Sequence, residues 1–354
     1  MEVAIVHLAL KKQVINLEQI KWFELIIKHS ATKQFVIFTN DSPSFKNFHS
    51  HQNLKIEYLK ENKLLQSIIA KRKAKSIIKK HQPKIVISLN SFLELDSSIP
   101  QIIFYHHRPS TKEALNLVKA KQIIVFTDYL KNILVQQFLI NENNVDVVKP
   151  IVSNIFQSLS LDEITSVKDG YSDGRNYFLY QYDESCSEDL ITILKAFSQF
   201  KKWQKTNMKL MVVSRYKSLP SSIKDKISTY KFKDDIVVIE NIIDEKYAWL
   251  LATAYGFIHI SSNPLNIFPL VEAIYTNTAI ISSSNDSFKE IITNAALLIK
   301  ENTVEEIANA LQEMYKNENL RSKLIEQANI KVIDYNINQT AHQFWQIVQN
   351  AIQV

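Results

Sequence analysis

The residues from Pro264 to Ala273 place groups that could do chemistry at the start of a predicted helix. They follow a strand-like run, residues 256–262, and Pro269 stands where proline is favoured in the first turn of a helix. The backbone amides that precede this helix are those of Asn266, Ile267 and Phe268. Because open amides and the helix dipole both attract negative charge, the segment predicts a site for a phosphate group.

Other kinds of chemistry lack a sequence motif. The chain has no H-E-x-x-H or D-x-D metal motif, no Walker loop, no G-x-S-x-G turn and no paired carboxylates of the kind that glycosidases use. Cys186 is the only cysteine, which rules out an internal disulfide and a metal site built from several cysteines. We therefore predict no metal and no cofactor.

Charge is divided unevenly along the chain. Through Pro150 there are 22 Lys or Arg against 12 Asp or Glu, a net charge of +10, so the total of +6 leaves −4 for the remainder. Much of the excess lies in residues 71–80. Two interpretations stay open: a solvated helix face, or a surface that docks on anionic lipid or an acidic acceptor. No nucleic-acid-binding motif accompanies these lysines, so nucleic acid is not an expected partner.

Two runs of alternating strands and helices must position these groups, which predicts parallel sheets with crossover helices. In the first half the predicted strands are residues 3–7, 35–39, 55–58, 85–88, 102–105 and 123–126, and the predicted helices are 15–28, 62–80 and 129–138. In the second half the predicted strands are residues 177–181, 209–213, 236–239, 256–260, 279–282 and 296–299. The helices there are 188–203, 221–229, 245–252, 269–276, 304–315 and 319–332.

These patterns divide the chain into four parts. We expect a first domain over residues 1–150, a linker region over 151–175, a second domain over 176–336 and a terminal helix over 337–354 that packs back toward the first domain. Both domains are expected to be Rossmann-like, doubly wound α/β domains that face each other across a cleft. Ligands of such sheets gather beyond the carboxyl ends of the strands.

The segment 264–273 resembles the donor-binding loop of a known family. In retaining family 4 glycosyltransferases, also called glycosyl transferases group 1, this loop reads E-G-F-G-L-P-x-L-E-A, and Pro269, Glu272 and Ala273 match its last positions. Further matches follow in the family's order at residues 279–282, 288–292, 295–299 and 305–311. Two earlier segments, residues 121–129 and 147–156, also resemble family motifs.

The resemblance implies the GT-B fold, with an acceptor-binding first domain and a nucleotide-sugar-binding second domain. It implies that Glu272 accepts hydrogen bonds from the ribose hydroxyls of the donor; the alternative is an ordinary first-turn glutamate favoured by the helix dipole. It also implies that His106 or His107 orients the acceptor hydroxyl or contacts the donor sugar. Neither histidine has an evident carboxylate partner nearby, since Arg108 follows where an aspartate is common.

Departures from the family pattern fall in the donor site. Pro264 replaces the first glutamate of the loop, and Asp183 and Glu188 stand where the family has the Arg and Lys that neutralise the donor pyrophosphate. Arg215 and Lys217 are the cations that could substitute for this pair, unless they are solvated loop charges.

The low glycine content of the chain also departs from what a phosphate-binding protein of this family is expected to have. The chain has 3 glycines, whereas the average usage of about 7% would give roughly 25. Loops that cradle phosphate use glycine for positive φ and for close backbone approach. The glycine-rich loop of the family's first domain is replaced here by residues 11–18.

Two functions stay open. The first is a metal-independent, hexosyl-type glycosyltransferase that moves a sugar with retention from a nucleotide sugar to a hydroxyl of a glycan, lipid-linked or protein acceptor. It would serve glycan or glycoconjugate synthesis in the cytoplasm. A second possible location is the inner face of an anionic membrane, with the protein in peripheral contact. The second is a catalytically inactive GT-B protein that acts as a binding or partner subunit.

Overall fold

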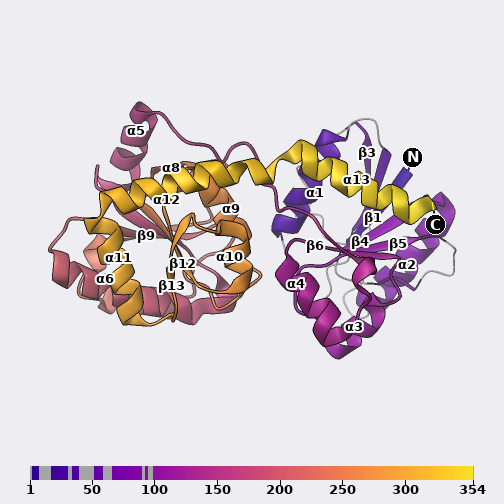
Figure 1. Cartoon of the computed structure of the whole chain (residues 1–354), viewed down its shortest axis with the longest axis horizontal. Coiled ribbons are helices and arrows are strands. Elements are labelled where there is room, and N and C mark those ends of the chain that lie inside the picture. The colour runs from indigo at the N-terminus through magenta and orange to yellow at the C-terminus, as the bar shows by residue number, and fades with distance from the viewer. Residues whose placement is uncertain are drawn as a thin grey trace. The chain divides into compact units, whose positions relative to one another are not determined.

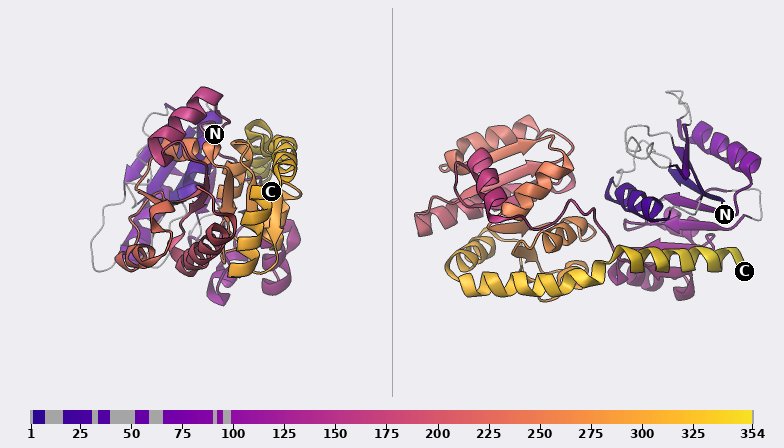
Figure 2. Two further views of the ribbon diagram at one scale, coloured as in Figure 1. Left: turned by 90° about the vertical axis from the view of Figure 1, so that its left-hand side faces the viewer. Right: turned by 90° about the horizontal axis from the view of Figure 1, so that it is seen from above.

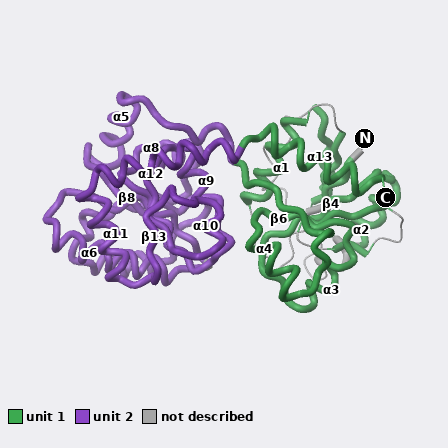
Figure 3. Tube along the Cα trace, in the orientation of Figure 1, with its two compact units in different colours: residues 1–151, 336–354 green, residues 152–335 purple. Residues whose placement is uncertain are grey.

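The chain folds into two compact units, each built on a parallel sheet (Figure 3). Unit 1 comprises Met1–Ile151 with Asn336–Val354, and unit 2 comprises Val152–Tyr335. The computed structural model describes residues 2–7, 17–30, 34–39, 52–58, 66–89, 92–94 and 99–353. Residues 11–18 stand in place of the family's glycine-rich loop, and of these, residues 11–16 lie outside the described ranges. The side chains of Lys71 and Lys73 are also outside the described part of the structure.

Unit 1 carries a parallel sheet in the order β3-β2-β1-β4-β5-β6-β7 (Figure 1). Its strands are β1 (Glu2–His7), β2 (Gln34–Thr39), β3 (Leu54–Tyr58), β4 (Ile85–Leu89), β5 (Gln101–Phe104), β6 (Gln122–Val125) and β7 (Val145–Val147). Its helices are α1 (Leu17–His29), α2 (Gln66–His81), α3 (Thr111–Leu117), α4 (Asp128–Asn132) and α13 (Ile337–Gln353). Strands β2, β4 and β5 are buried almost throughout, which is why they read as continuous apolar runs.

Helix α13 belongs to unit 1 and packs against α1. The ring of Phe344 lies 5.5 Å from the ring of Trp22 and 5.9 Å from that of Phe23, centroid to centroid. The Nε1 of Trp345 donates a hydrogen bond to the Oγ of Ser30 at 2.7 Å. The apolar face of the last helix is therefore buried on the first helix of the chain.

Unit 2 carries a second parallel sheet in the order β10-β9-β8-β11-β12-β13. Its strands are β8 (Tyr177–Gln181), β9 (Lys209–Ser214), β10 (Ile236–Glu240), β11 (Gly256–His259), β12 (Ile280–Ser283) and β13 (Ala296–Ile299). Its helices are α5 (Leu161–Ser172), α6 (Ser187–Gln204), α7 (Ser221–Thr229), α8 (Asp244–Thr253), α9 (Phe268–Tyr275), α10 (Asp286–Ile292), α11 (Val304–Lys316) and α12 (Glu318–Lys331).

Helices lie on both faces of the unit 2 sheet (Figure 2). Helices α6 and α11 pack together, and their apolar stripes form one core with the strands, in which Phe178, Phe197 and Leu311 are fully buried. The other helices in contact include α8 with α9 and α9 with α12. Because each strand is followed by a crossover helix, the loops that leave the strands all gather at the carboxyl edge of the sheet.

The structure differs from the sequence-based expectations in five elements, one of which is helix α10, whose residues were not predicted to be helical. Helix α5 fills residues 161–172 of the expected linker, and a capping box between Ser160 and Glu163 starts it. Helix α3 begins with the same motif at Ser110 and was not predicted, and neither was the three-residue strand β7. The expected helix over 129–138 is α4 followed by a π-helical turn at Ile133–Gln137.

Candidate functional site

The carboxyl edge of the unit 2 sheet has the topology of a ligand site. Strands β8, β9 and β10 follow one another toward one side of the sheet, and β11, β12 and β13 toward the other, so the order reverses between β8 and β11. Ligands of doubly wound sheets bind in the crevice at such a point. Two loops flank it here: residues 182–186 after β8 and residues 260–267 after β11.

Two carboxylates join these loops. Asp189, buried in the first turn of α6, accepts hydrogen bonds from the backbone N of Ser262 at 2.8 Å and from its Oγ at 2.7 Å. The Nδ2 of Asn266 lies 3.4 Å from the Oδ2 of Asp183. Asp183 stands where the family pattern has a pyrophosphate-binding cation, whereas the contacts of Asp189 were not predicted, because an aspartate in a first helical turn is ordinary.

Several amides of the loop after β11 are engaged within the loop itself. The backbone N of Asn266 donates to the carbonyl O of Asn263 at 3.2 Å, and that of Leu265 donates to the Oδ1 of Asn263 at 3.1 Å. Ile267 and Phe268 are buried. The expectation that the Asn266 amide is open to a phosphate therefore does not hold in this conformation, since the tight turn at Asn263 already uses it.

Arg215 and Glu272, which are 57 residues apart in the sequence, form a buried ion pair. The Nη1 of Arg215 lies 2.8 Å from the Oε1 of Glu272, and each side chain is 1% exposed. The Nη2 of Arg215 donates to the Oδ1 of Asp244, the first residue of α8, at 2.7 Å. Arg215 is thus not a solvated loop charge, because both ends of its guanidinium fork bind carboxylates inside the protein.

Aromatic rings complete the surroundings of Arg215. The guanidinium carbon lies 4.4 Å from the ring centroid of Tyr247, 5.2 Å from that of Tyr216 and 5.8 Å from that of Phe156. A desolvated cation over an aromatic face gains roughly 2 kcal/mol. The cluster of Arg215, Glu272, Asp244 and these rings, which we call the Arg215 cluster, replaces the hydration that the guanidinium loses.

Glu272 is not an ordinary solvent-facing glutamate of a first helical turn. Every residue of α9 from Phe268 to Ile274 is buried, Glu272 included. Its carboxylate is oriented by Arg215 instead of by water. Lys217 is the opposite case: its side chain is 73% exposed, and its Nζ lies 2.6 Å from the Oε2 of Glu184 in an exposed pair.

His259 supports the same loop from the end of β11. Its ring lies 4.6 Å from the ring of Phe288, centroid to centroid, and stacks at 5.8 Å on Phe257. Burial lowers the pKa of His259 from its ordinary 6.5 to about 3, against the opposing effect of a hydrogen bond with the backbone of Asn266. The imidazole is therefore neutral at physiological pH and holds the 260–267 loop without adding charge.

The two histidines of unit 1 lie directly after β5, where they were expected. His107 Nε2 lies 2.9 Å from the hydroxyl of Tyr105 and 3.1 Å from the Oε1 of Glu113, and the His106 ring lies 5.4 Å from the His107 ring. Glu113 therefore supplies the carboxylate partner that was not evident from the sequence. It is six residues away, and the capping box of α3 brings it close.

Glu113 is held in its ionised form. Burial alone would raise its pKa, but hydrogen bonds from Ser110 and His107, together with the charge interaction with His107, lower it overall. Burial and the charge of Glu113 raise the pKa of Tyr105, whose phenol stays protonated. A histidine between a carboxylate and a phenol can orient or accept a proton.

Comparison with solved structures identifies the fold of the chain. The glycosyltransferase WaaG, involved in lipopolysaccharide biosynthesis, is 12% identical over 98% of this chain and 99% of its own, with a TM-score of 0.76. A glycosyltransferase from Rickettsia africae is 15% identical over 99% and 98%, with a TM-score of 0.81. HepE from Anabaena in complex with UDP-glucose is 11% identical over 99% and 100%, with a TM-score of 0.81. The chain has the GT-B fold, as predicted.

The family match follows from the sequence of unit 2. Residues 170–331 match the family model described as Glycosyl transferases group 1. The resemblance found from the donor-loop motif is thereby confirmed. No curated protein matches the sequence.

Two further features concern the described residues alone. None of the helices described is both long and apolar enough to cross a membrane. Within the same residues, no three His, Cys, Asp or Glu side chains converge closely enough to hold a metal ion.

Proposed function

We propose that the chain is a glycosyltransferase that binds a nucleotide-sugar donor at the carboxyl edge of the unit 2 sheet. The observation that carries the proposal is the place of Glu272. It lies in the helix that follows the switch-point loop, inside the segment that matches Glycosyl transferases group 1. The structural relative HepE was solved with UDP-glucose, which supports a nucleotide sugar as the donor class.

Each residue of the proposed site has a physical role. Glu272 accepts hydrogen bonds from the ribose hydroxyls, and Arg215 fixes the orientation and the negative charge of that carboxylate through the 2.8 Å contact. The exposed ammonium group of Lys217 balances charge on the diphosphate. His107, backed by Glu113, orients the acceptor hydroxyl in unit 1. Positioning and charge stabilisation of this kind require no metal, and we propose transfer of a hexose with retention.

The acceptor and the location are part of the proposal. We propose a hydroxyl of a glycan, lipid-linked or protein acceptor in the cytoplasm, with helix α2 in peripheral contact with anionic lipid through Lys75, Lys79 and Lys80. Each lysine near such a surface contributes about 1 kcal/mol. Cosedimentation with anionic vesicles should fall as salt rises, whereas equal recovery with neutral vesicles would contradict the membrane contact.

A second function is favoured by one specific observation. Charged groups of the expected donor site bind each other: Arg215 binds Glu272 and Asp244, and Lys217 binds Glu184. A donor must compete with these contacts and reach a fully buried carboxylate. If this competition fails, the chain is a catalytically inactive GT-B protein that serves as a binding or partner subunit.

Isothermal calorimetry separates the two functions. Uridine, guanosine and adenosine diphosphates and their sugar derivatives are titrated into the parent chain, Glu272→Gln and the exposed control Glu326→Gln. A transferase should bind one donor, and loss of a charged hydrogen bond worth roughly 1.5 to 3 kcal/mol should weaken binding about tenfold or more in Glu272→Gln alone. Lys217→Gln, whose side chain is exposed, is a second probe that leaves the core intact. If the parent binds none of these compounds at millimolar concentration, the inactive alternative replaces the proposal.

A further inference from the structure

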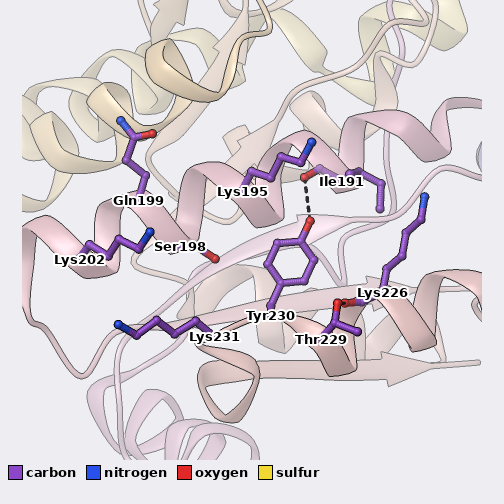
Figure 4. Close-up of a pocket in the computed structure, with 9 residues that line it drawn as sticks. All are labelled: Ile191, Lys195, Ser198, Gln199, Lys202, Lys226, Thr229, Tyr230 and Lys231. Atoms are coloured by element: carbon purple, nitrogen blue, oxygen red, sulfur yellow. Dashed lines mark hydrogen bonds between the residues drawn. The ribbon is translucent and has the colours of Figure 1, made fainter.

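A second concave site lies in unit 2 on helices α6 and α7, apart from the donor-site residues (Figure 4). It is a cavity of about 830 Å³, in the size range of small-molecule sites. Its walls come from residues 191–202 of α6, with three of the five lining residues in the C-terminal half of that helix, and from the C-terminal end of α7 with the two residues after it. In a doubly wound sheet these helix ends lie toward the amino ends of the strands, whereas the Arg215 cluster lies at the carboxyl ends.

The sequence spacing creates one face of this cavity. Ile191, Lys195, Ser198 and Lys202 lie at intervals of four, three and four residues, which places them in one row along α6. The opposite face of the same helix carries Phe197 and Phe200 into the core, so the row must face outward. Lys226, Thr229, Tyr230 and Lys231 supply the facing wall from α7 and the residues after it.

The lysines of the cavity differ in charge balance from neighbouring lysines of the same helices. Lys201, one residue from the row, pairs with Asp235 at 2.8 Å, and Lys224 pairs with Glu240 at 2.8 Å. Lys195, Lys202, Lys226 and Lys231 are exposed, and within the described part of the chain none has an ion-pair partner within 4.0 Å. No Asp or Glu lines the cavity. Four positive charges thus surround one concavity although the chain after Pro150 has a net charge of −4.

The hydroxyl groups of the cavity already donate their protons to the backbone. Tyr230 donates to the carbonyl O of Ile191 at 3.5 Å, Ser198 to that of Leu194 at 3.0 Å and Thr229 to that of Lys226 at 2.7 Å. A neutral sugar would depend on such hydroxyl donors. Ammonium groups are instead the main free donors, and they bind phosphate as point charges.

We propose that this cavity is a binding site for a ligand with at least two negative phosphate charges, such as a diphosphate group. One source of that chemistry is a free phosphorylated small molecule, and another is the phosphate of a lipid headgroup. Binding neutralises lysines that otherwise repel each other, and it weakens as salt screens the charges over a Debye length of about 8 Å at physiological ionic strength.

The test uses the full chain and two probes, inorganic pyrophosphate and vesicles of phosphatidic acid, whose phosphate monoester can carry two negative charges. The pocket variant is Lys195→Gln with Lys226→Gln, and the matched control is Lys300→Gln with Lys323→Gln, which removes two exposed lysines elsewhere in unit 2. All four positions are exposed, so each variant should unfold at the temperature of the parent. Calorimetry measures pyrophosphate binding, and cosedimentation measures vesicle binding against neutral phosphatidylcholine.

We expect the pocket variant to lose at least tenfold in affinity for one probe, with a change of less than twofold in the control. A loss for pyrophosphate identifies a free phosphorylated ligand, and a loss for vesicles alone identifies a lipid headgroup. The proposal is overturned if the parent binds neither probe, if the pocket variant binds both as the parent does, or if the control loses as much as the pocket variant.

Discussion

Arg215 shows how a single cation can be taken out of water and kept charged. It gives up hydration at 1% side-chain exposure and gains two carboxylates, Glu272 and Asp244, with the ring of Tyr247 on its face. A buried pair of this kind adds little net stability when intact, but the loss of one partner leaves an uncompensated buried charge. The cluster should therefore be sensitive to single substitutions.

Arg215→Met should destabilise the protein by about 3 to 5 kcal/mol, because it leaves Glu272 buried without its counter-charge. Urea unfolding of the parent and the variant measures this loss. Adding Glu272→Gln should recover part of it, since the second change removes the stranded charge. Lys217→Met, in the exposed pair with Glu184, should cost less than about 0.5 kcal/mol. If Arg215→Met and Lys217→Met lower the free energy of unfolding equally, the buried ion pair contributes no more to stability than the exposed one.

His259 makes stability depend on pH in a defined window. The unfolded chain takes up a proton near pH 6.5, whereas the buried ring resists protonation down to about pH 3. Its contribution is therefore complete above about pH 6.5 and is lost progressively as the pH falls toward 3. Between pH 7.5 and 5.5 the parent should lose about 1 kcal/mol more than His259→Asn in urea titrations. Parallel losses in the two proteins would refute this assignment.

The sequence was enough to select residues of the candidate site, but it did not show which of them form ion pairs with each other. Glu272 and Arg215 were both selected, one from the donor-loop motif and one from its position after a strand. No local rule joins residues 57 positions apart, so their ion pair appears only when α9 and the end of β9 are placed side by side. Glu113 could have been found, because Ser110 and Glu113 form the spacing of a capping box.

At the scale of elements, hydrophobic patterning located the strands and most of the long helices. Buried strands such as β4 and β9 are mostly apolar, and α6 and α11 carry apolar stripes at helical spacing. Short elements were missed for a physical reason: α3 has only seven residues and β7 only three, so neither contains enough periods to stand out. Gly170 within α5 and Gly174 just after it gave this segment the composition of a linker.

A shortage of glycine leaves other residues in left-handed backbone positions. Lys205, which ends α6, has a φ of 48°, and Asn277 has a φ of 57°. Residues other than glycine rarely adopt the left-handed backbone region. Glycine is the residue that most often ends a helix in this conformation.

Lys205→Gly should stabilise the protein by roughly 0.5 to 1 kcal/mol, because glycine takes the left-handed conformation without a steric penalty. Thermal unfolding should show a rise in melting temperature. Lys205→Ala is the matched control, since it removes the same side chain and keeps the Cβ, and it should not raise the temperature. A rise of equal size in both variants would point to the lost lysine and not to the backbone.

At the scale of the molecule, a truncation or substitution in one unit should change the unfolding of that unit and leave the unfolding of the other unchanged. Unit 2 is one continuous segment with its own core, whereas unit 1 is completed by residues 336–354. Deleting those residues uncovers the rings of Trp22 and Phe23. Calorimetry should then show a large fall in one unfolding transition and an unchanged second transition.

Phe344→Ala is a milder probe of the same interface and should cost about 3 to 5 kcal/mol in unit 1. Gln349→Ala, on the exposed side of α13, should change stability little. If the truncated chain melts as the parent does, α13 does not stabilise unit 1.

Because α13 follows unit 2 in the sequence, the two units are also completed in a definite order during synthesis. The ribosome releases the strands of unit 1 first, but the helix that covers Trp22 emerges only after all of unit 2 has been translated. At about 5 to 20 residues per second this interval is roughly ten to forty seconds. Over that time the nascent first unit presents an aromatic face that chaperones recognise, and the unit translated second is the first to be complete.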